Sequence, residues 1–232
     1  MKALQLWSSM LTAGLVLSGC GSDNNNPPPE PVILSYKVTV TNLTFSQPMT
    51  PMTIVYHGND YRFFEVGESV SVAFENFAES GANVDLLTEL SSTNQVEANI
   101  GGTGLILPGK SDTVMIEGES TTCISVATML ANTNDAFAGI NCVDVSELQV
   151  GQQVEIDIVT YDAGTEANSE LASTIPGPAG GGAGFAAIRD DRDFVSVHAG
   201  VVTKDDGLMT SVLTQMHKWD NPAASVMIER IN

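Results

Sequence analysis

Two oxygen-rich loops carry the side chains best suited to chemistry. The first is Asn132–Asp135 (NTND) and the second is Tyr161–Glu166 (YDAGTE), and each directly follows an apolar run typical of a strand. If those two strands are neighbours, the carboxylates of Asp135, Asp162 and Glu166 converge. Carboxylates held together repel unless a cation neutralises them or some of them bind protons. Calcium, a hard ion that takes roughly 6–8 oxygen ligands, would resolve that repulsion.

The same residue types also have a purely structural use. Aspartate and asparagine form turns by bonding to their own backbone, so both loops could be ordinary turns that bind no metal. Gly164 would let the second loop turn tightly around an ion, but neither loop has the spacing of an EF-hand. Spacing alone therefore leaves the calcium site and the plain turns both open.

Alternating apolar and polar residues predict that these loops connect short strands. Residues 36–41 alternate with a period of two, and residues 154–158 do so with Glu155 and Asp157 on the polar side, which indicates a half-buried strand with an acidic outer face. Similar β-rich runs lie at residues 52–56, 114–116, 123–130, 194–202 and 224–231. Clusters of Gly, Pro, Asn and Asp separate the runs, a pattern typical of an all-β antiparallel β-sandwich.

One stretch has helical spacing instead. Val70, Ala73, Phe74 and Phe77 fall at i, i+3, i+4 and i+7, which predicts a short amphipathic helix ending near Gly81. Residues 86–90 contain three leucines that could form a second short helix. At this spacing the aromatic side chains indicate core packing.

The charge balance excludes several classes of partner. With 28 acidic against 9 basic residues the formal net charge is −19, which argues against nucleic-acid binding and against electrostatic docking on anionic lipid. The chain is 43% hydrophobic and only 16% charged, so it can form a packed core and does not have the composition of a disordered protein.

The N-terminal segment resembles a targeting signal. After Lys2 an apolar run extends to Leu17, shorter than the roughly 20 apolar residues that span a bilayer. It ends in Leu-Ser-Gly-Cys at residues 17–20, which resembles the lipobox of bacterial lipoproteins. The resemblance implies a signal peptide over residues 1–19 and a lipid on Cys20, and Gly21 favours the outer membrane, on its periplasmic or surface face.

The lipobox resemblance divides the rest of the chain into two segments. Residues 20–31 contain no large apolar side chain and are rich in proline and asparagine, which predicts a disordered tether, and residues 32–232 form the folded domain. Lipidation of Cys20 leaves Cys123 and Cys142, which in an oxidising compartment are candidates for a disulfide. Two buried free thiols are the alternative.

From about Lys37 onward the chain resembles the spondin N-terminal domain family, in its bacterial lipoprotein branch. The most specific match is the string Tyr161–Glu166, placed after the Asn132–Asp135 loop. Other matching stretches are Val40–Thr44, Gln47-Pro48, Pro51, His57, Ala78–Gly81, Pro108-Gly109, Ser125, Met129, Pro176–Pro178, His198 and Gly200.

The resemblance implies an eight-stranded antiparallel sandwich that binds one calcium ion, with an extracellular role in adhesion. Carried over by position, the metal ligands are Asp135, Asp162 and Glu166. The chain departs from the animal members of the family in two places. Glu166 stands where the animal domains have aspartate, and no tryptophan follows Asp135 as it does there.

Catalysis finds little support in the sequence. The three histidines, His57, His198 and His217, lie in no H-E-x-x-H or H-x-H string, and no G-x-S-x-G nucleophile motif is present. We therefore expect a noncatalytic, lipid-anchored envelope protein whose calcium-binding domain serves adhesion or interaction with a protein or glycan. A metal-free structural envelope lipoprotein is the alternative, and a hydrolase a distant third.

Overall fold

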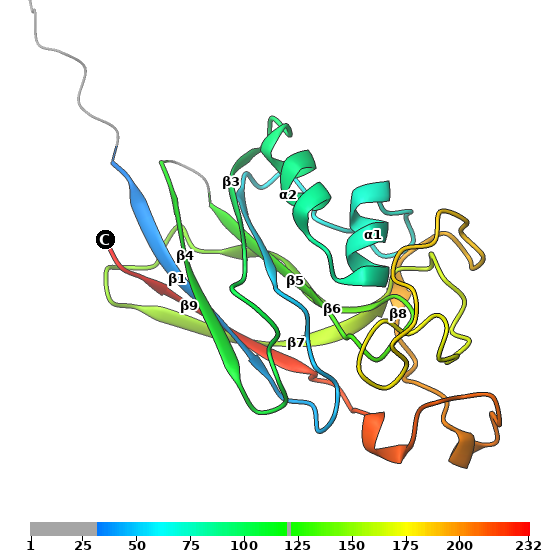
Figure 1. Ribbon diagram of the computed structural model, residues 1–232. Helices are drawn as coiled ribbons and strands as arrows, with labels where there is room; N and C mark the ends of the chain where they lie inside the picture. The colour runs from blue at the N-terminus through cyan, green and yellow to red at the C-terminus, as the bar shows by residue number, and fades with distance from the viewer. Residues whose placement is uncertain (1–31, 120–121) are drawn as a thin grey trace, which may run out of the picture. The chain divides into compact units, whose positions relative to one another are not determined.

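The alternating segments form two antiparallel sheets that share one strand (Figure 1). The computed structural model describes residues 32–119 and 122–232. Its strands are β1 Leu34–Asn42, β2 Thr53–His57, β3 Val96–Gly101, β4 Ser111–Gly118, β5 Cys123–Met129, β6 Ala136–Asp144, β7 Gln153–Asp162, β8 Ser196–Val197 and β9 Ala224–Arg230. The hydrogen-bonded order is β3-β2-β5-β6-β7-β9-β1-β4, with the short β8 also paired to β7. The predicted all-β antiparallel sandwich is therefore confirmed.

Strand β7 belongs to both sheets. Residues 153–158 pair with β9, whereas residues 159–162 pair with β6. The side chains between the sheets form the main core, in which Tyr36, Val38 and Val40 of β1 are fully buried. On β7 Glu155 and Asp157 are exposed, so the acidic outer face expected from the alternation is confirmed.

Two helices cover the outer face of the sheet that contains β5 and β6: α1 Val72–Ser80 packs on these two strands, and α2 Val84–Ser91 packs beside α1 and against β3 (Figure 1). Helix α1 begins after Ser71, whose hydroxyl oxygen accepts a hydrogen bond from the backbone N–H of Phe74. It ends at Gly81, which has the left-handed conformation common at helix C-termini. Both helices lie where the sequence predicts them, although Val70, the first residue of the predicted spacing, precedes α1.

The helices explain why β5 and β6 lack a regular alternation of apolar and polar residues. All seven residues of β5 are buried, because the core covers one face and the helices cover the other. Strand β6 was not predicted, since burial of both faces near its start removes the polar alternation. Its Gly139 has no side chain, and a Cβ there would lie 2.9 Å from the ring of Phe64.

Two further strands differ from the sequence prediction. Strand β3 was not predicted, and the strand expected over residues 194–202 is limited to β8. Within the described ranges no helix is both long enough and apolar enough to cross a membrane. The predictions for residues 1–31, including the lipidated Cys20, lie outside the described residues.

Candidate metal centre

Asp135 and Asp162 lie together because of β6. Asp135 immediately precedes β6, and Ala136 at the start of that strand is paired in register with Asp162. The sequence argument required the strands before the two loops, β5 and β7, to be neighbours. Instead β6 lies between them, and the loop after β5 turns the chain back so that Asp135 reaches the end of β7.

The Asp135 carboxylate is fully buried, and only one of its two oxygens accepts hydrogen bonds. Its Oδ2 accepts hydrogen bonds from the backbone N–H of Thr165 at 2.8 Å and of Glu166 at 3.2 Å. Its Oδ1 is buried without a hydrogen-bond partner. Burial, followed by the negative charge of Asp162, raises the pKa of Asp135 to about 8. Such a group is costly to ionise unless positive charge is supplied nearby.

The other two predicted ligands are also buried but have hydrogen-bond partners. Asp162 Oδ1 accepts from the N–H of Gly164 at 2.8 Å, and its Oδ2 accepts from Asn168 Nδ2 at 2.6 Å. Glu166 Oε2 accepts from Asn134 Nδ2 at 3.1 Å. The structure thus brings Asp135 and Asp162 together, while the carboxylate of Glu166 is engaged by Asn134.

Glu166 also faces a second group of acids. Burial is the largest cause that raises its pKa to about 7, and the charges of Glu79 and Asp190 raise it further. Glu79 lies on α1 and is itself fully buried, with Oε1 lacking a partner. Across residues 32–119 and 122–232 no three His, Cys, Asp or Glu side chains are arranged to hold a metal ion.

His198 is a further member of this region that spacing did not identify. Its Nδ1 accepts a hydrogen bond from the N–H of Gly200 at 2.9 Å, so the neutral ring carries its proton on Nε2. That Nε2 is buried without a partner, and the ring packs on Trp219 with centroids 5.3 Å apart. Burial lowers the pKa of His198 while the charge of Asp162 opposes this. Its match to a family position was the only sequence signal.

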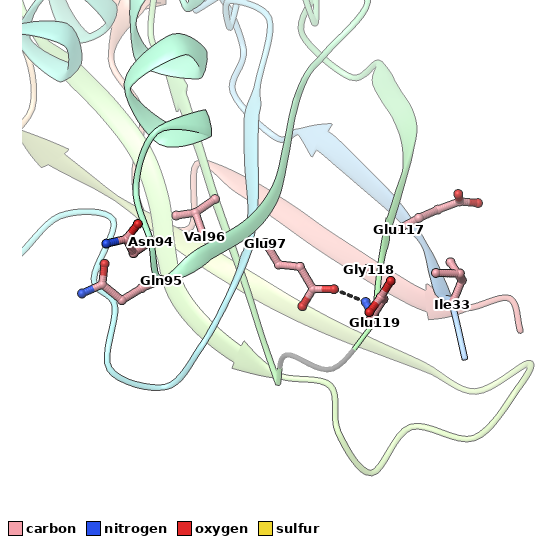
Figure 2. A pocket seen from close by; sticks show the side chains of 8 residues that line it. All are labelled: Ile33, Asn94, Gln95, Val96, Glu97, Glu117, Gly118 and Glu119. Atoms are coloured by element: carbon pink, nitrogen blue, oxygen red, sulfur yellow. Dashed lines mark hydrogen bonds between the residues drawn. The ribbon is translucent and has the colours of Figure 1, made fainter. Parts of the chain in front are cut away.

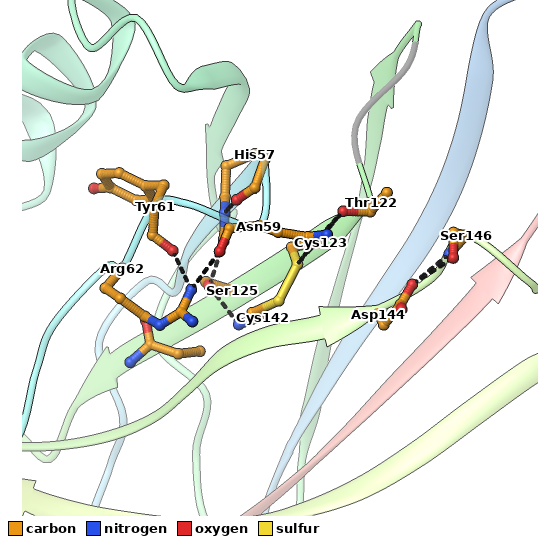
Figure 3. The surroundings of a disulfide bond; sticks show 12 residues. His57, Asn59, Tyr61, Arg62, Thr122, Cys123, Ser125, Cys142, Asp144 and Ser146 are labelled. Atoms are coloured by element: carbon orange, nitrogen blue, oxygen red, sulfur yellow. Dashed lines mark hydrogen bonds between the residues drawn. A yellow bond between two sulfur atoms is a disulfide. The ribbon is translucent and has the colours of Figure 1, made fainter.

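The predicted disulfide between Cys123 and Cys142 is confirmed, and it links β5 to β6 (Figure 3). Beside it His57 Nδ1 bonds to the carbonyl of Gly58, so this nitrogen is the donor and Nε2 accepts from the hydroxyl of Ser125 at 2.6 Å. Ser125 in turn accepts from the N–H of Cys142 at 2.9 Å. Both His57 and Ser125 are fully buried, so the pair connects β2, β5 and β6 inside the fold.

The fold and the site define an antiparallel β-sandwich domain with buried acids in the loops beside β6 and β7. Residues 41–176 match the family model of Spondin_N, which is more than half of the 232 residues. The chain therefore belongs to the Spondin_N family. A search of curated proteins finds no match. The matched range contains Asp135, Asp162 and Glu166, whereas His198 lies beyond it.

Proposed function

We propose that this chain is a noncatalytic, lipid-anchored interaction module of the cell envelope that binds one calcium ion between the loops at Asp135 and Asp162. Its Spondin_N domain indicates an extracellular interaction module. Beyond this, we propose a lipid anchor at Cys20, one bound calcium ion and a role in adhesion. The calcium assignment rests on two carboxylates: that of Asp135, whose buried Oδ1 has no hydrogen-bond partner, and that of Asp162, whose negative charge acts on it.

The residues of the two loops suit a hard cation in part. Asp135 and Asp162 supply adjacent carboxylates, and calcium is held by carboxylate and backbone carbonyl oxygens. Glu166 would join them by releasing the side-chain amide of Asn134, which its longer side chain allows. A bound ion would supply the positive charge that lets Asp135 ionise inside the protein, and would order both loops at the surface offered to a partner.

Melting temperature with calcium and with chelator tests this assignment. An ion that binds only the folded chain stabilises it by RT ln(1 + [L]/Kd), about 2.7 kcal/mol at a hundredfold excess over Kd. We expect the full chain to melt higher in calcium, and Asp162→Asn to abolish the difference. Asp157→Asn is the matched control, since Asp157 is exposed on the same strand. The absence of a calcium-dependent shift at millimolar calcium would reject the site.

A metal-free structural lipoprotein is the second candidate, and the hydrogen bonds favour it. Asp162 and Glu166 already have polar partners, and the described side chains form no complete three-ligand group. Under this alternative the chelator has no effect, and Asp162→Asn lowers stability equally with and without calcium. The same melting experiment therefore separates the two candidates.

The anchoring and noncatalytic parts rest on separate observations. Cys20→Ser should move the protein from the membrane fraction to the soluble fraction, and continued membrane association of that variant would reject the lipid anchor. The noncatalytic assignment is supported by the burial of His57 and Ser125, because a substrate cannot reach a nucleophile enclosed in the fold. Turnover of a generic ester substrate that requires Ser125 would contradict it.

A further inference from the structure

A cavity of about 320 Å³ lies between the segment before α1 and the two helices, remote in sequence from the loops at Asp135 and Asp162. We call it the aromatic pocket. Its size is at the lower end of the roughly 300–1,000 Å³ found for ligand sites. Its lining includes four aromatic residues, Tyr61, Phe63, Phe64 and Phe74, and three glutamates, Glu65, Glu68 and Glu89.

The floor of the aromatic pocket is made of rings. Phe63 and Phe64 are each 6% exposed, and both pack against Phe74 of α1, with the Phe63 and Phe74 centroids 5.2 Å apart. Tyr61 is half-buried and presents a fourth ring. Because Phe74 also packs on Phe137 of β6, the floor is fixed to the sheet rather than to a mobile loop.

The rim of the aromatic pocket is negative. Glu65, Glu68 and Glu89 are exposed, and none of them forms an ion pair with any residue in the described ranges. Glu89 accepts a hydrogen bond from the hydroxyl of Ser71 at 2.8 Å. Arg62, the one basic residue among the described lining residues, donates from Nη1 to two backbone carbonyls, each at 2.8 Å, which directs its guanidinium to its own loop.

Rings at the floor, and rim carboxylates that form no ion pair within the described ranges, are the combination that attracts an organic cation. The face of an aromatic ring attracts a cation, and rim carboxylates add Coulombic attraction. A larger hollow of about 660 Å³ near the start of β1 contains Glu97, Glu117 and Glu119 (Figure 2). Among the described residues that line that hollow none is aromatic, so these residues offer charge without rings.

We propose that the aromatic pocket binds a lysine or arginine side chain presented by a partner protein. The cavity has the volume of about ten water molecules at roughly 30 Å³ each, enough for one such side chain to enter past the carboxylates. A basic partner is complementary to a chain with a net charge of −19, and the floor accommodates the methylene groups of the side chain. The assignment goes beyond the calcium site and does not depend on it.

Titration of the full chain with the blocked tripeptide acetyl-Gly-Lys-Gly-amide, followed by NMR amide shifts, tests the proposal. We expect saturable shifts around residues 61–74, equal in calcium and in chelator, and binding at least tenfold weaker when the lysine is acetylated. Tyr61→Leu retains an apolar side chain but removes the ring, and should weaken binding about threefold to tenfold.

Charge-matched variants complete the test. The triple variant Glu65→Gln, Glu68→Gln, Glu89→Gln should weaken the lysine peptide at least tenfold. Its control removes three exposed acids from elsewhere, with Glu147→Gln, Glu155→Gln and Asp157→Asn, and should leave affinity within twofold. Equal affinity for the two triple variants, or for wild type and Tyr61→Leu, would overturn the proposal. Tighter binding of tetramethylammonium than of the peptide would overturn it too, since that result assigns the pocket to a small free cation.

Discussion

Replacing Asp135 by asparagine should stabilise the calcium-free protein at alkaline pH and abolish its response to calcium. The variant keeps the size of the side chain and an oxygen that can accept from the N–H groups of Thr165 and Glu166. It removes the buried carboxyl that is costly to ionise. Its amide nitrogen takes the place of Oδ1, which has no hydrogen-bond partner, and the negative charge of Asp162 that disfavours a carboxylate there favours amide hydrogens.

The magnitude follows from the pKa of Asp135. Folding raises this pKa from 3.8 to about 8, a difference that corresponds to on the order of 5 kcal/mol. Because the folded chain holds the proton more tightly than the unfolded chain, the contribution to stability is complete below about pH 4. It is then lost as the pH rises to about 8, at about 1.4 kcal/mol per pH unit for one proton.

Urea unfolding between pH 5 and pH 8 in chelator measures the effect, with the fluorescence of Trp219 as a probe. Other carboxyls whose pKa is raised, such as Glu166 and Glu170, are common to both proteins, so the difference between wild type and Asp135→Asn reports Asp135 together with its interaction with Asp162. We expect that difference to increase with pH in favour of the variant. In saturating calcium the order should reverse, because only the wild type retains the ligand.

Two results would refute this reasoning. The first is a difference between wild type and Asp135→Asn that does not change from pH 5 to pH 8 in chelator. The second is a variant less stable than wild type at pH 8 without calcium. Asp157→Asn on the exposed face of β7 serves as the control and should show no comparable slope.

Three predictions concern the scaffold that holds the loops. Gly81→Ala should cost about 2–4 kcal/mol, because φ there is +73° and a Cβ would lie 2.2 Å from Thr50 Cγ2; a loss below about 1 kcal/mol in urea unfolding would contradict the clash. Phe74→Ala should cost about 3–5 kcal/mol by removing a nearly fully buried ring of the helix–sheet core, and thermal unfolding with an unchanged Tm would refute that packing. Replacing Cys123 and Cys142 by alanine opens a loop with a sequence separation of 19 and should cost about 3 kcal/mol; equal stability of wild type with and without reductant would argue against the bond.

Local sequence patterns were enough to predict several strands, the first helix and the family of this protein. The period-two alternation of residues 36–41 and 154–158 marked β1 and β7 and their outer faces, half-buried on β1 and exposed on β7, because each strand turns one face to the core. The spacing of Val70, Ala73, Phe74 and Phe77 and the glycine at 81 marked α1 and its end. The YDAGTE string at residues 161–166 indicated the family, to which the chain belongs.

Other features depended on the packing of distant segments. Strand β6 is buried near its start on both faces by core and helices, so no alternation marked it. That strand brings Asp135 to Asp162, and no pattern within either loop contains this information. The neighbours that raise the pKa of Glu166, Glu79 on α1 and Asp190, are likewise far away in the sequence.

The aromatic pocket likewise combines a feature that the sequence predicts with one that only tertiary packing creates. The helical spacing assigned Phe74 to the core, and the structure agrees, yet the ring also forms part of the floor of a cavity. Its rim is assembled from Glu65 and Glu68 before α1 and Glu89 near the end of α2. Residue types and periodicity decide which face of each element is buried, because those are short-range properties. Which buried acids and rings become neighbours depends on strand order and helix docking, and only the tertiary structure decides it.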